Sequence, residues 1–375
     1  MFSVETLVQQ ALWVGLVSVL MALMITIIDS IVNNYGEVVV SINGKKDMTV
    51  KGGSKLLATL ADQGVFLPSA CGGRGSCGAC KCQVDSDVGP HLPTETPYLT
   101  DREVKQNVRL ACQVKVKADI KISIPEELFN IKKLTCKVEK IVDVTYDIKE
   151  VTLKMPHGTD LSYVSGQYGQ FEVPPYGDSK EATARAYSFS SNPQRKDELE
   201  FLIRLVPGGI VTTYVHQHLK VGQNINVIVP VGDFHVRDTD AAMICVAGGS
   251  GMAPFKSIFN DMIERGTMGT RDVWYFFGAR TTRDIYYLDW LWGLDKKYER
   301  FHFVPALSEP KPGEAWDGPV GLITEVLDKY LQEKIPLDQA KEGYLCGSPG
   351  MLDACMSVMR KNKMTEDKIY FDKFA

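Results

Sequence analysis

The sequence lacks the features that mark several large classes of protein. Its 375 residues carry a formal net charge of -4 and contain no cluster of Lys and Arg. General nucleic-acid binders show a basic field, so we expect no nucleic-acid partner. No internal repeat or low-complexity tract is evident, and the composition of 45% hydrophobic and 23% charged residues is ordinary for folded protein. A chain of this length predicts two or three domains.

A secretory signal is also missing, because no positive segment and no small-residue cleavage site accompany the first apolar run. The nine cysteines are an odd number spread along the whole chain, which argues against a disulfide framework of the small secreted kind. Cys82, Cys136, Cys245 and Cys355 lie among apolar or strand-like neighbours. We expect these four side chains to be buried as small hydrophobic groups.

Charge is absent between Glu5 and Asp29, where residues 11–28 read ALWVGLVSVLMALMITII. As a helix, the uncharged run would span about 30–35 Å, enough for a bilayer. A buried core helix would carry polar positions at helical spacing, and an interfacial helix would need a charged face. We therefore expect a transmembrane anchor over residues 1–33, with Asp29 at the membrane edge.

The orientation of this anchor follows from its flanks. No Lys or Arg precedes the run, whereas Lys45, Lys46, Lys51 and Lys55 follow it. This asymmetry places the long C-terminal part in the cytoplasm. The expected location is the inner (cytoplasmic) membrane, crossed once, with the soluble domains on the cytoplasmic side.

Three patterns of secondary structure follow the anchor. In residues 36–128, apolar runs flank Asn43-Gly44, which is a hairpin signal. A short helix over 54–64 precedes strands at 81–84 and 120–124, and this pattern predicts a compact α+β domain. Residues 132–236 hold frequent alternating strands typical of an antiparallel barrel or sandwich. Residues 237–375 alternate strands with helices, as in an α/β doubly wound parallel sheet.

The cysteine pattern is the strongest single signal of chemistry. Cys71, Cys77 and Cys80 follow the spacing C-x5-C-x2-C, and 31 residues separate Cys80 from Cys112. Glycines in this loop let its backbone curl so that amides face the sulfurs of an iron–sulfur cluster. The plant-type spacing is C-x4-C-x2-C, one residue shorter. A structural zinc site is the alternative, but zinc ribbons usually have two CxxC pairs and only one is present. The pattern favours a [2Fe–2S] cluster.

Two further motifs suit a flavin. Arg185, Tyr187 and Ser188 lie in an expected strand, where Arg can hold a pyrophosphate, Tyr can lie on an isoalloxazine and Ser can bond its N5 atom. Half-buried strand residues are the structural alternative. The stretch GGIVTT at 208–213 opens an expected helix, whose backbone amides can receive phosphate, although an ordinary helix start explains it equally well.

The last motifs suit a nicotinamide dinucleotide. The stretch AGGSGMAP at 247–254 follows an expected strand and opens a helix, the geometry that binds a pyrophosphate. The stretch CGSP at 346–349 ends a later strand of the same sheet, at the edge where ligands bind. A buried thiol followed by a plain turn is the alternative for it.

Together these motifs resemble the ferredoxin–NADP reductase superfamily fused to a plant-type ferredoxin domain. The resemblance is closer to the F-subunit family of sodium-translocating NADH:quinone oxidoreductases, and it covers essentially the whole chain. The stretches that carry it are SACGGRGSCGAC, HLPTE, RLACQVKVKADI, IPEELFNIKK, RAYS, GGSGMAP, FGAR and the C-terminal FDKFA. The N-terminal helix is absent from soluble relatives such as the reductase components of multicomponent monooxygenases.

The resemblance implies an α+β ferredoxin-like (β-grasp) domain at 36–128, an antiparallel β-barrel flavin domain at 132–236 and a nicotinamide-binding domain at 237–375. It also implies an NADH-oxidising enzyme that uses FAD and a [2Fe–2S] cluster, with other membrane subunits of a quinone-reductase complex as partners and quinone reached indirectly. By position, the cluster ligands would be Cys71, Cys77, Cys80 and Cys112. FAD would be held by Arg185, Tyr187 and Ser188, with Gly209, Val211 and Thr212 at its pyrophosphate. The NADH loop would be formed by Gly249, Gly251 and Pro254, and the residues near the nicotinamide would be Cys346, Gly347 and Pro349. Ser188, Cys346 and Phe374 are the implied catalytic residues. Phe374 would cover the flavin face, unless it is only a tail residue packed for stability.

NADH gives two electrons as hydride and a cluster accepts one at a time, so a flavin must stand between them. We expect electrons to pass from NADH to FAD, to [2Fe–2S] and to a membrane acceptor. Two departures from the family are a shorter stretch between Tyr168 and Arg185 and an end without a closing glycine. Arg280 in FGAR is placed where it could favour the 2′-phosphate of NADPH. Two other functions remain open: a reductase component donating electrons to a monooxygenase, and a non-enzymatic membrane tether that holds zinc.

Overall fold

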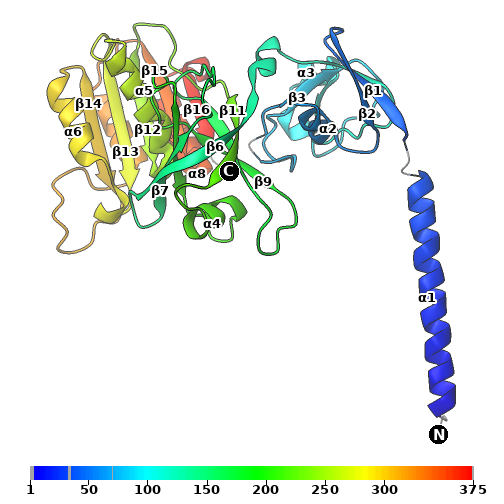
Figure 1. Cartoon of the computed structure of the whole chain (residues 1–375). Helices are drawn as coiled ribbons and strands as arrows, with labels where there is room; N and C mark the ends of the chain where they lie inside the picture. The colour runs from blue at the N-terminus through cyan, green and yellow to red at the C-terminus, as the bar shows by residue number, and fades with distance from the viewer. Residues whose placement is uncertain (1–3, 33–34, 70, 374–375) are drawn as a thin grey trace. The chain divides into compact units, whose positions relative to one another are not determined.

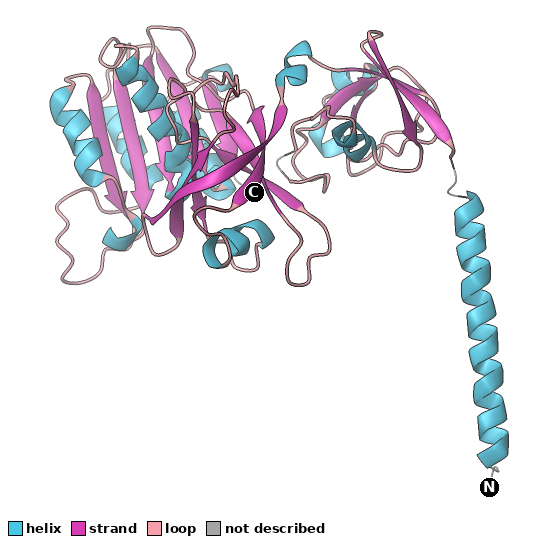
Figure 2. Ribbon diagram, in the orientation of Figure 1, coloured by secondary structure: helices cyan, strands magenta, loops and turns pink. Residues whose placement is uncertain are grey.

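The computed structural model describes residues 4–32, 35–69 and 71–373. The chain divides into two units, one made of Met1–Leu67 with Gly73–Phe129 and the other of Pro68–Gly72 with Asn130–Ala375. Figure 1 labels the elements of both units, and Figure 2 separates helices from strands by colour. The predicted domain boundaries at 36–128, 132–236 and 237–375 remain predictions.

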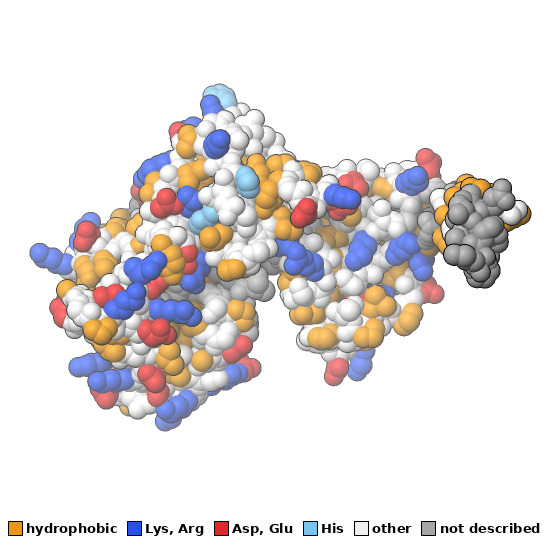
Figure 3. Space-filling view, turned by 90° about the horizontal axis from the view of Figure 1, so that it is seen from below, with side chains coloured by type: hydrophobic (Ala, Val, Ile, Leu, Met, Phe, Trp, Pro, Cys, Tyr) orange, Lys and Arg blue, Asp and Glu red, His pale blue; other side chains and the backbone are white. Residues whose placement is uncertain are grey.

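The first unit begins with helix α1 (Val4–Val32). The side chains described without a break on α1 are those of residues 12–27, which are exposed and mostly apolar (Figure 3). Among the described residues, no helix has both the length and the apolar character required to span a membrane. The predicted transmembrane anchor is therefore not supported.

A five-stranded mixed sheet in the order β2-β1-β5-β3-β4 forms the body of the first unit. Its elements are β1 (Glu37–Ile42), β2 (Lys46–Lys51), α2 (Leu56–Asp62), β3 (Lys81–Val84), α3 (Asp101–Lys105), β4 (Val108–Leu110) and β5 (Ile120–Ser123). Asn43 and Gly44 both have positive φ, 54° and 62°, as the tight turn of an antiparallel hairpin requires. The predicted hairpin, helix and strands of this domain are confirmed.

A buried ion pair ties the loop after β3 to β4. The Arg109 guanidinium donates from Nε and Nη2 to the two Glu95 carboxylate oxygens, at 3.0 and 2.7 Å. Both side chains are at most 2% exposed. The carboxylate also accepts the backbone N–H groups of Leu92 and Leu110. One carboxylate thus fixes the turn at residues 92–95 against the strand that leads to Cys112.

The second unit contains a six-stranded antiparallel sheet in the order β10-β7-β6-β11-β8-β9. Its elements are β6 (Lys132–Asp143), β7 (Ile148–Lys154), β8 (Tyr168–Val173), β9 (Thr183–Ser188), β10 (Glu198–Arg204), α4 (Ile210–Gln217) and β11 (Asn224–Val231). The edges β9 and β10 approach only beyond the end of β9, at the single bridge Phe189–Phe201. The predicted barrel is therefore a half-barrel, whose phenylalanine-rich interior includes Phe171, Phe189 and Phe201.

A parallel five-stranded sheet in the order β14-β13-β12-β15-β16 completes the second unit. Its elements are β12 (Ala242–Gly248), α5 (Met252–Glu264), β13 (Val273–Ala279), α6 (Leu288–Lys297), β14 (Phe301–Leu307), α7 (Ile323–Glu333), β15 (Lys341–Gly347), α8 (Pro349–Lys361) and β16 (Ile369–Lys373). Separate hydrophobic clusters cover its two faces. The predicted doubly wound sheet is confirmed.

All nine cysteines lie within the described residues, and none of them is joined in a disulfide bond. Cys82, Cys136, Cys245 and Cys355 are at most 3% exposed. Their predicted burial among apolar side chains is confirmed.

The Glu95–Arg109 pair yields a stability prediction for the first unit. Arg109→Met should lower the free energy of unfolding by about 3–5 kcal/mol, because it leaves a carboxylate buried without its counterion. Burial raises the pKa of Glu95, but Arg109 and the two backbone amides outweigh it and hold that pKa below its ordinary value. The stabilisation is therefore present above the pKa of an unfolded Glu and is lost as pH falls through the lower folded value. Native-state hydrogen exchange of the β4 and β5 amides, in the parent protein and in Arg109→Met, measures this free energy of unfolding and its dependence on pH.

A double variant, Glu95→Leu with Arg109→Met, is the matched control. Replacing both charges with apolar groups should recover most of the loss. Equal destabilisation by the single and double variants would show that the side chains act through shape and not through charge.

Candidate functional site

The loop between β12 and α5 is shaped by two glycines. Gly249 has a φ of 56°, and its carbonyl accepts the Tyr286 hydroxyl at 2.8 Å. A Cβ on Gly251 would lie 2.1 Å from the carbonyl oxygen of Cys346, so no side chain fits there. Pro254 is buried in the first turn of α5. The predicted strand, glycine loop and helix are confirmed as local structure, and the loop packs directly on the end of β15.

The end of β15 repeats this arrangement on the neighbouring strand. Cys346 is fully buried, and burial raises the pKa of its thiol well above the ordinary value. Gly347 has a φ of 151°, and a Cβ there would lie 2.7 Å from Cε of Met351. Pro349 opens α8, where a missing N–H costs nothing. The two helices α5 and α8 thus begin side by side at the carboxyl edge of the sheet, where ligands bind in folds of this kind.

The strand β9 carries the residues predicted to hold a flavin. Tyr187 packs edge-on against Phe171, with ring centroids 6.2 Å apart, and burial raises the pKa of its hydroxyl. Arg185 donates to the Ala184 carbonyl at 2.7 Å. On the neighbouring strand, Gln170 pairs with Ala186, and its buried Nε2 has no hydrogen-bond partner among the described residues.

Helix α4 begins at Gly209, its N-cap. The first N–H groups of a helix have no intrahelical partner and suit an anion. The Val211 side chain is buried in the sheet core, so only its backbone can reach a ligand. The Thr212 hydroxyl accepts from the Val206 amide at 3.2 Å, which gives this side chain a part in holding the preceding turn.

Ser188, Cys346 and Asp372 meet where the two sheets of the second unit join. Ser188 Oγ donates to Asp372 Oδ2 at 3.2 Å, and its hydroxyl partly opposes the rise in the pKa of the Cys346 thiol. Cys346 and Asp372 are direct neighbours in the parallel pair β15–β16. The sequence reasoning missed Asp372, although it lies in the FDKFA stretch that carries part of the resemblance. Phe374, the third predicted catalytic residue, lies outside the described residues.

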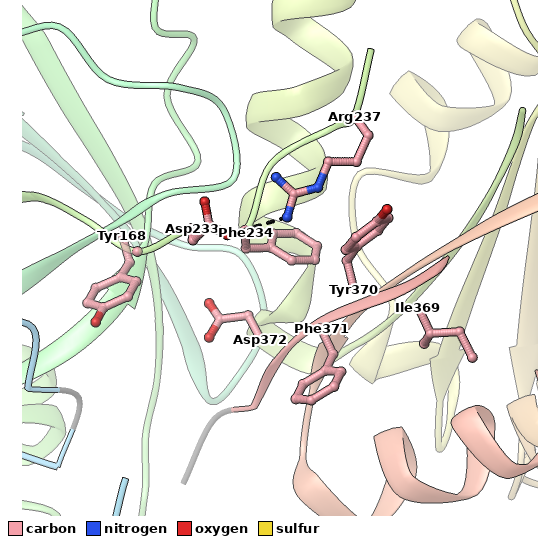
Figure 4. Close-up of a pocket in the computed structure, with 9 residues that line it drawn as sticks. Tyr168, Asp233, Phe234, Arg237, Ile369, Tyr370, Phe371 and Asp372 are labelled. Carbon is pink, nitrogen blue, oxygen red and sulfur yellow. Dashed lines mark hydrogen bonds and ion pairs between the residues drawn. The ribbon is translucent and has the colours of Figure 1, made fainter. Parts of the chain in front are cut away.

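Asp372 also lines a cavity of about 320 Å³. Figure 4 shows its carboxylate projecting from the end of β16 into this space, which Tyr168, Phe234 and Arg237 border. Arg237 lies over the ring of Tyr370, 4.6 Å from its centroid. Desolvation raises the pKa of Asp372 from 3.8 to about 6, although the Ser188 hydroxyl opposes the shift. A carboxyl that titrates near neutral pH therefore sits beside a buried serine and a buried thiol.

The half-barrel holds α5 through polar contacts that the sequence reasoning did not find. Lys256 Nζ lies 2.7 Å from a carboxylate oxygen of Glu150 and of Glu200, which belong to β7 and β10. Ser257 donates to the carbonyl of Ser191 at 2.6 Å, three residues beyond Ser188. The helix that follows the glycine loop is thus fixed to the strand that carries Ser188, and no local sequence signal indicates these long-range pairs.

The cysteine loop belongs mainly to the first unit. Gly75 and Gly78 have φ values of 78° and 68°, and a Cβ on Gly78 would lie 2.8 Å from Tyr98. Cys80 and Cys112 are each 1% exposed and hydrogen-bond one another. Cys77 is half-buried, and Cys71 lies in the segment Pro68–Gly72, which groups with the other unit.

This loop fits a metal cluster in its chemistry. The adjacent Cys112 thiol and burial raise the pKa of Cys80 far above its ordinary value, so a bound cation would have to draw off the protons. Within the described part of the chain, no three or more His, Cys, Asp or Glu side chains form a group that could hold a metal ion. The assignment of the four cysteines as ligands stays a prediction.

The raised pKa of Asp372 predicts a specific dependence of stability on pH. Between the unfolded pKa and about 6, the folded protein binds more protons than the unfolded chain, so its stability falls as pH rises through this window and stays lower above it. Asp372→Asn removes the titration and should stabilise the protein by about 1–3 kcal/mol at pH 7.5 and by nearly nothing at pH 4. Urea unfolding at the two pH values measures the difference.

Ser188→Ala serves as the control for this prediction. It removes the hydrogen bond that opposes the shift, so the fall in stability with pH should become steeper and not disappear. A parent protein and an Asp372→Asn variant with the same pH dependence would rule out the proposed titration.

Comparison with known protein families is consistent with this geometry. The 2Fe-2S iron-sulfur cluster binding domain matches residues 40–117, the oxidoreductase FAD-binding domain matches residues 135–236 and the oxidoreductase NAD-binding domain matches residues 245–357. The predicted FAD, [2Fe–2S] and nicotinamide cofactors are thus confirmed at the level of domains.

Two solved structures are similar to most of this chain. A cytochrome P450 reductase of Amycolatopsis superposes with a TM-score of 0.71 and 27% identity, over 90% of this chain and 98% of that one. A ferredoxin reductase in carbazole 1,9a-dioxygenase superposes with a TM-score of 0.67 and 26% identity, over 91% of this chain and 99% of that one.

Two curated relatives extend over nearly the full length, and both are named as the F subunit of a Na(+)-translocating NADH-quinone reductase. The relative from Marinomonas sp. is 35% identical over 100% of both chains, and the one from Pseudomonas paraeruginosa is 36% identical over 97% of this chain and 96% of its own. The first alignment runs over 411 positions against 375 residues here, so that relative has segments that this chain lacks. By its cofactor domains and its full-length identity, this chain belongs to the F-subunit family of the Na(+)-translocating NADH-quinone reductases.

Proposed function

We propose that this chain is the electron-input subunit of a membrane NADH:quinone oxidoreductase of the sodium-translocating type, which oxidises NADH and delivers electrons to its partner subunits. One observation carries the proposal. The flavin motif on β9 and the nicotinamide motif on β15 converge at Ser188 and Cys346, with Asp372 bonded to Ser188. Hydride transfer needs donor and acceptor sites that meet at one point.

The residues of the second unit suit the roles that we assign to them. The first N–H groups of α4 would receive the FAD pyrophosphate, together with Arg185. Gly249 and Gly251 would let the NADH pyrophosphate approach the backbone at the start of α5. Phe374 would cover the flavin ring. When bound, FAD supplies the exchange between two-electron and one-electron transfer.

The chain's own side chains would control protons and water at the junction. Ser188 and Asp372 form a hydrogen-bonded pair that can hold a proton, since the pKa of Asp372 is about 6. Cys346 is neutral and fully buried, so it would keep water from the reacting atoms. Lys256 would fix the distance between the two binding motifs through Glu150 and Glu200.

In the first unit we propose Cys71, Cys77, Cys80 and Cys112 as ligands of the [2Fe–2S] cluster. Support comes from the pair of buried thiols at Cys80 and Cys112 and from the left-handed glycines of the loop. The three-residue segment GSC before Gly78 would turn backbone amides toward the sulfurs, as iron–sulfur loops require.

Partner subunits would receive the electrons, and the full-length relatives are named as subunits of such a complex. We propose attachment to that complex at the cytoplasmic side of the inner membrane. The exposed apolar side chains of α1, including Leu16, Leu20 and Leu23, support a hydrophobic partner for this helix. Translocation of sodium and reduction of quinone would belong to the assembled complex.

The nucleotide preference can be tested by comparing two substrates. Arg280 is exposed and directly follows β13, and the relatives are named for NADH. We expect kcat/KM to be at least about tenfold higher for NADH than for NADPH, a difference of about 1.4 kcal/mol in transition-state binding. If Arg280 instead selects a 2′-phosphate, the preference is reversed and Arg280→Ala abolishes it.

The order of electron transfer is tested by Cys77→Ala. This variant should abolish reduction of the membrane acceptor and leave NADH-driven bleaching of the flavin absorbance unchanged, because flavin and cluster lie on different domains. Stopped-flow absorbance follows the two steps separately, and Cys82→Ala, at a buried cysteine outside the predicted ligand set, is the control. Loss of flavin reduction in a folded Cys77→Ala protein would contradict the proposed order.

A second function is favoured by the solved structures. Both the P450 reductase and the dioxygenase ferredoxin reductase superpose on at least 90% of this chain, so donation of electrons to an oxygenase is the alternative. Assays of washed membranes separate the two functions. NADH-dependent quinone reduction that depends on this chain supports the proposal, and co-purification with a hydroxylase supports the alternative.

A further inference from the structure

The residue after Cys112 makes a hydrogen bond that none of the cofactor motifs includes. Gln113 Nε2 donates to the Sγ atom of Cys112 at 3.4 Å. The backbone of Gln113 is fixed by its own N–H, which donates to the Leu110 carbonyl at 2.7 Å. The side-chain amide therefore projects from a closed turn toward the sulfur.

The other end of this amide is also held. Thr94 Oγ1 donates to Gln113 Oε1 at 3.2 Å, which leaves the NH₂ group facing Cys112. On the opposite side, a Cβ on Gly75 would lie only 2.6 Å from Gln113 Nε2. The half-buried Gln113 amide thus lies between Gly75 of the cysteine loop and the exposed Thr94 of the turn at residues 92–95, and Gly75 leaves the space that it occupies.

Thr94 and Gln113 are kept in register by the buried ion pair. The Glu95 carboxylate accepts N–H groups from both Leu92 and Leu110, and Arg109 fixes it from the other side. Thr94 lies beside Glu95, and Gln113 lies three residues beyond Leu110. The orientation of the amide is therefore set by a rigid network in the described part of the first unit.

We propose that Gln113 is a positioning residue for the redox chemistry: its hydrogen bond to Cys112 raises the reduction potential of the [2Fe–2S] cluster, and Thr94 orients the amide that makes it. This inference rests on the proposed function, because it requires Cys112 to ligate the cluster. An N–H group directed at a ligating sulfur stabilises the extra negative charge of the reduced cluster, and hydrogen bonds to the sulfurs are among the factors that set these potentials.

A purely structural role for Gln113 predicts a different result. If the side chain only filled the space under Gly75, an apolar residue of similar size would preserve the cluster and its potential. Gln113→Leu makes this comparison, because leucine keeps much of the volume and continues to exclude water while it removes the donor. Thr94→Val keeps Gln113 and every cysteine and removes only the hydroxyl that orients the amide.

The experiment is a redox titration of the full-length holoprotein, followed by electron paramagnetic resonance of the reduced cluster. At a fixed potential, Gln113→Leu should lower the ratio of reduced to oxidised cluster about tenfold, which corresponds to about 59 mV for one electron. Thr94→Val should shift the ratio in the same direction by a smaller factor. The flavin, titrated by absorbance in the same sample, should keep its potential.

Gln83→Leu is the matched control. Gln83 lies exposed on β3, and its amide donates to Asp85 at 3.0 Å and not to a sulfur, so its replacement should leave the cluster potential unchanged. An unshifted potential in Gln113→Leu overturns the inference. If that variant does not assemble its cluster, Thr94→Val decides alone, and an unshifted potential there also overturns it. A parent protein without a cluster signal contradicts the proposed function itself.

Discussion

The candidate site of the second unit depends on one backbone contact, the approach of Gly251 to the carbonyl of Cys346. A Cβ at Gly251 would lie 2.1 Å from that oxygen, closer than real atoms approach, so only glycine allows the β12 loop to close on the end of β15. This contact sets the starting points of α5 and α8 together. Because β16 pairs with β15, it also determines where Asp372 lies. Replacing this glycine would move every group at the junction.

A comparable constraint organises the first unit with different chemistry. There a single buried carboxylate, Glu95, joins a turn to a strand and is neutralised by Arg109. A buried pair of this kind contributes little net stability when compared with apolar packing, but it specifies geometry strongly, since each oxygen has a fixed donor. These hydrogen bonds fix the turn at residues 92–95 and the strand that leads to Cys112 relative to one another. In both units, the positions of the site residues therefore depend on contacts with the backbone as well as on the cofactor-binding motifs themselves.

The sequence predicted features whose causes are local. The hairpin at Asn43-Gly44, the alternation of strands and helices after residue 237 and the glycine loop at Gly249–Gly251 each follow from a few adjacent residues, and the structure confirms them. Whole-chain resemblance added the cofactors and the family. Two predictions required more than local pattern. The barrel closes only at the bridge between Phe189 and Phe201, and membrane spanning by α1 is not supported.

The features that the sequence did not predict all depend on long-range contacts. Asp372 is linked to Ser188 across 184 positions, Lys256 to Glu150 across 106 and Gln113 to Thr94 across 19. Each is an ordinary polar residue in its local context, and nothing in its neighbours distinguishes it from a solvated surface group. Only the register of β16 beside β15, the packing of α5 on the half-barrel and the turn at residues 92–95 show these contacts.

The buried carboxyl of Asp372 affects the stability of the protein, and this effect depends on pH. A carboxyl whose pKa is raised to about 6 is unfavourable in its ionised form at neutral pH, so it costs stability wherever the protein works above that value. A neutral asparagine would keep the hydrogen bond to Ser188 without that cost. The presence of a carboxyl at position 372, despite its cost in stability, is explained if the site needs a group that can both hold and release a proton near neutral pH. A carboxyl can do so and an amide cannot. Carboxyl groups with a pKa raised by desolvation are concentrated at functional sites, and a stability cost of this kind is the usual price of such a site.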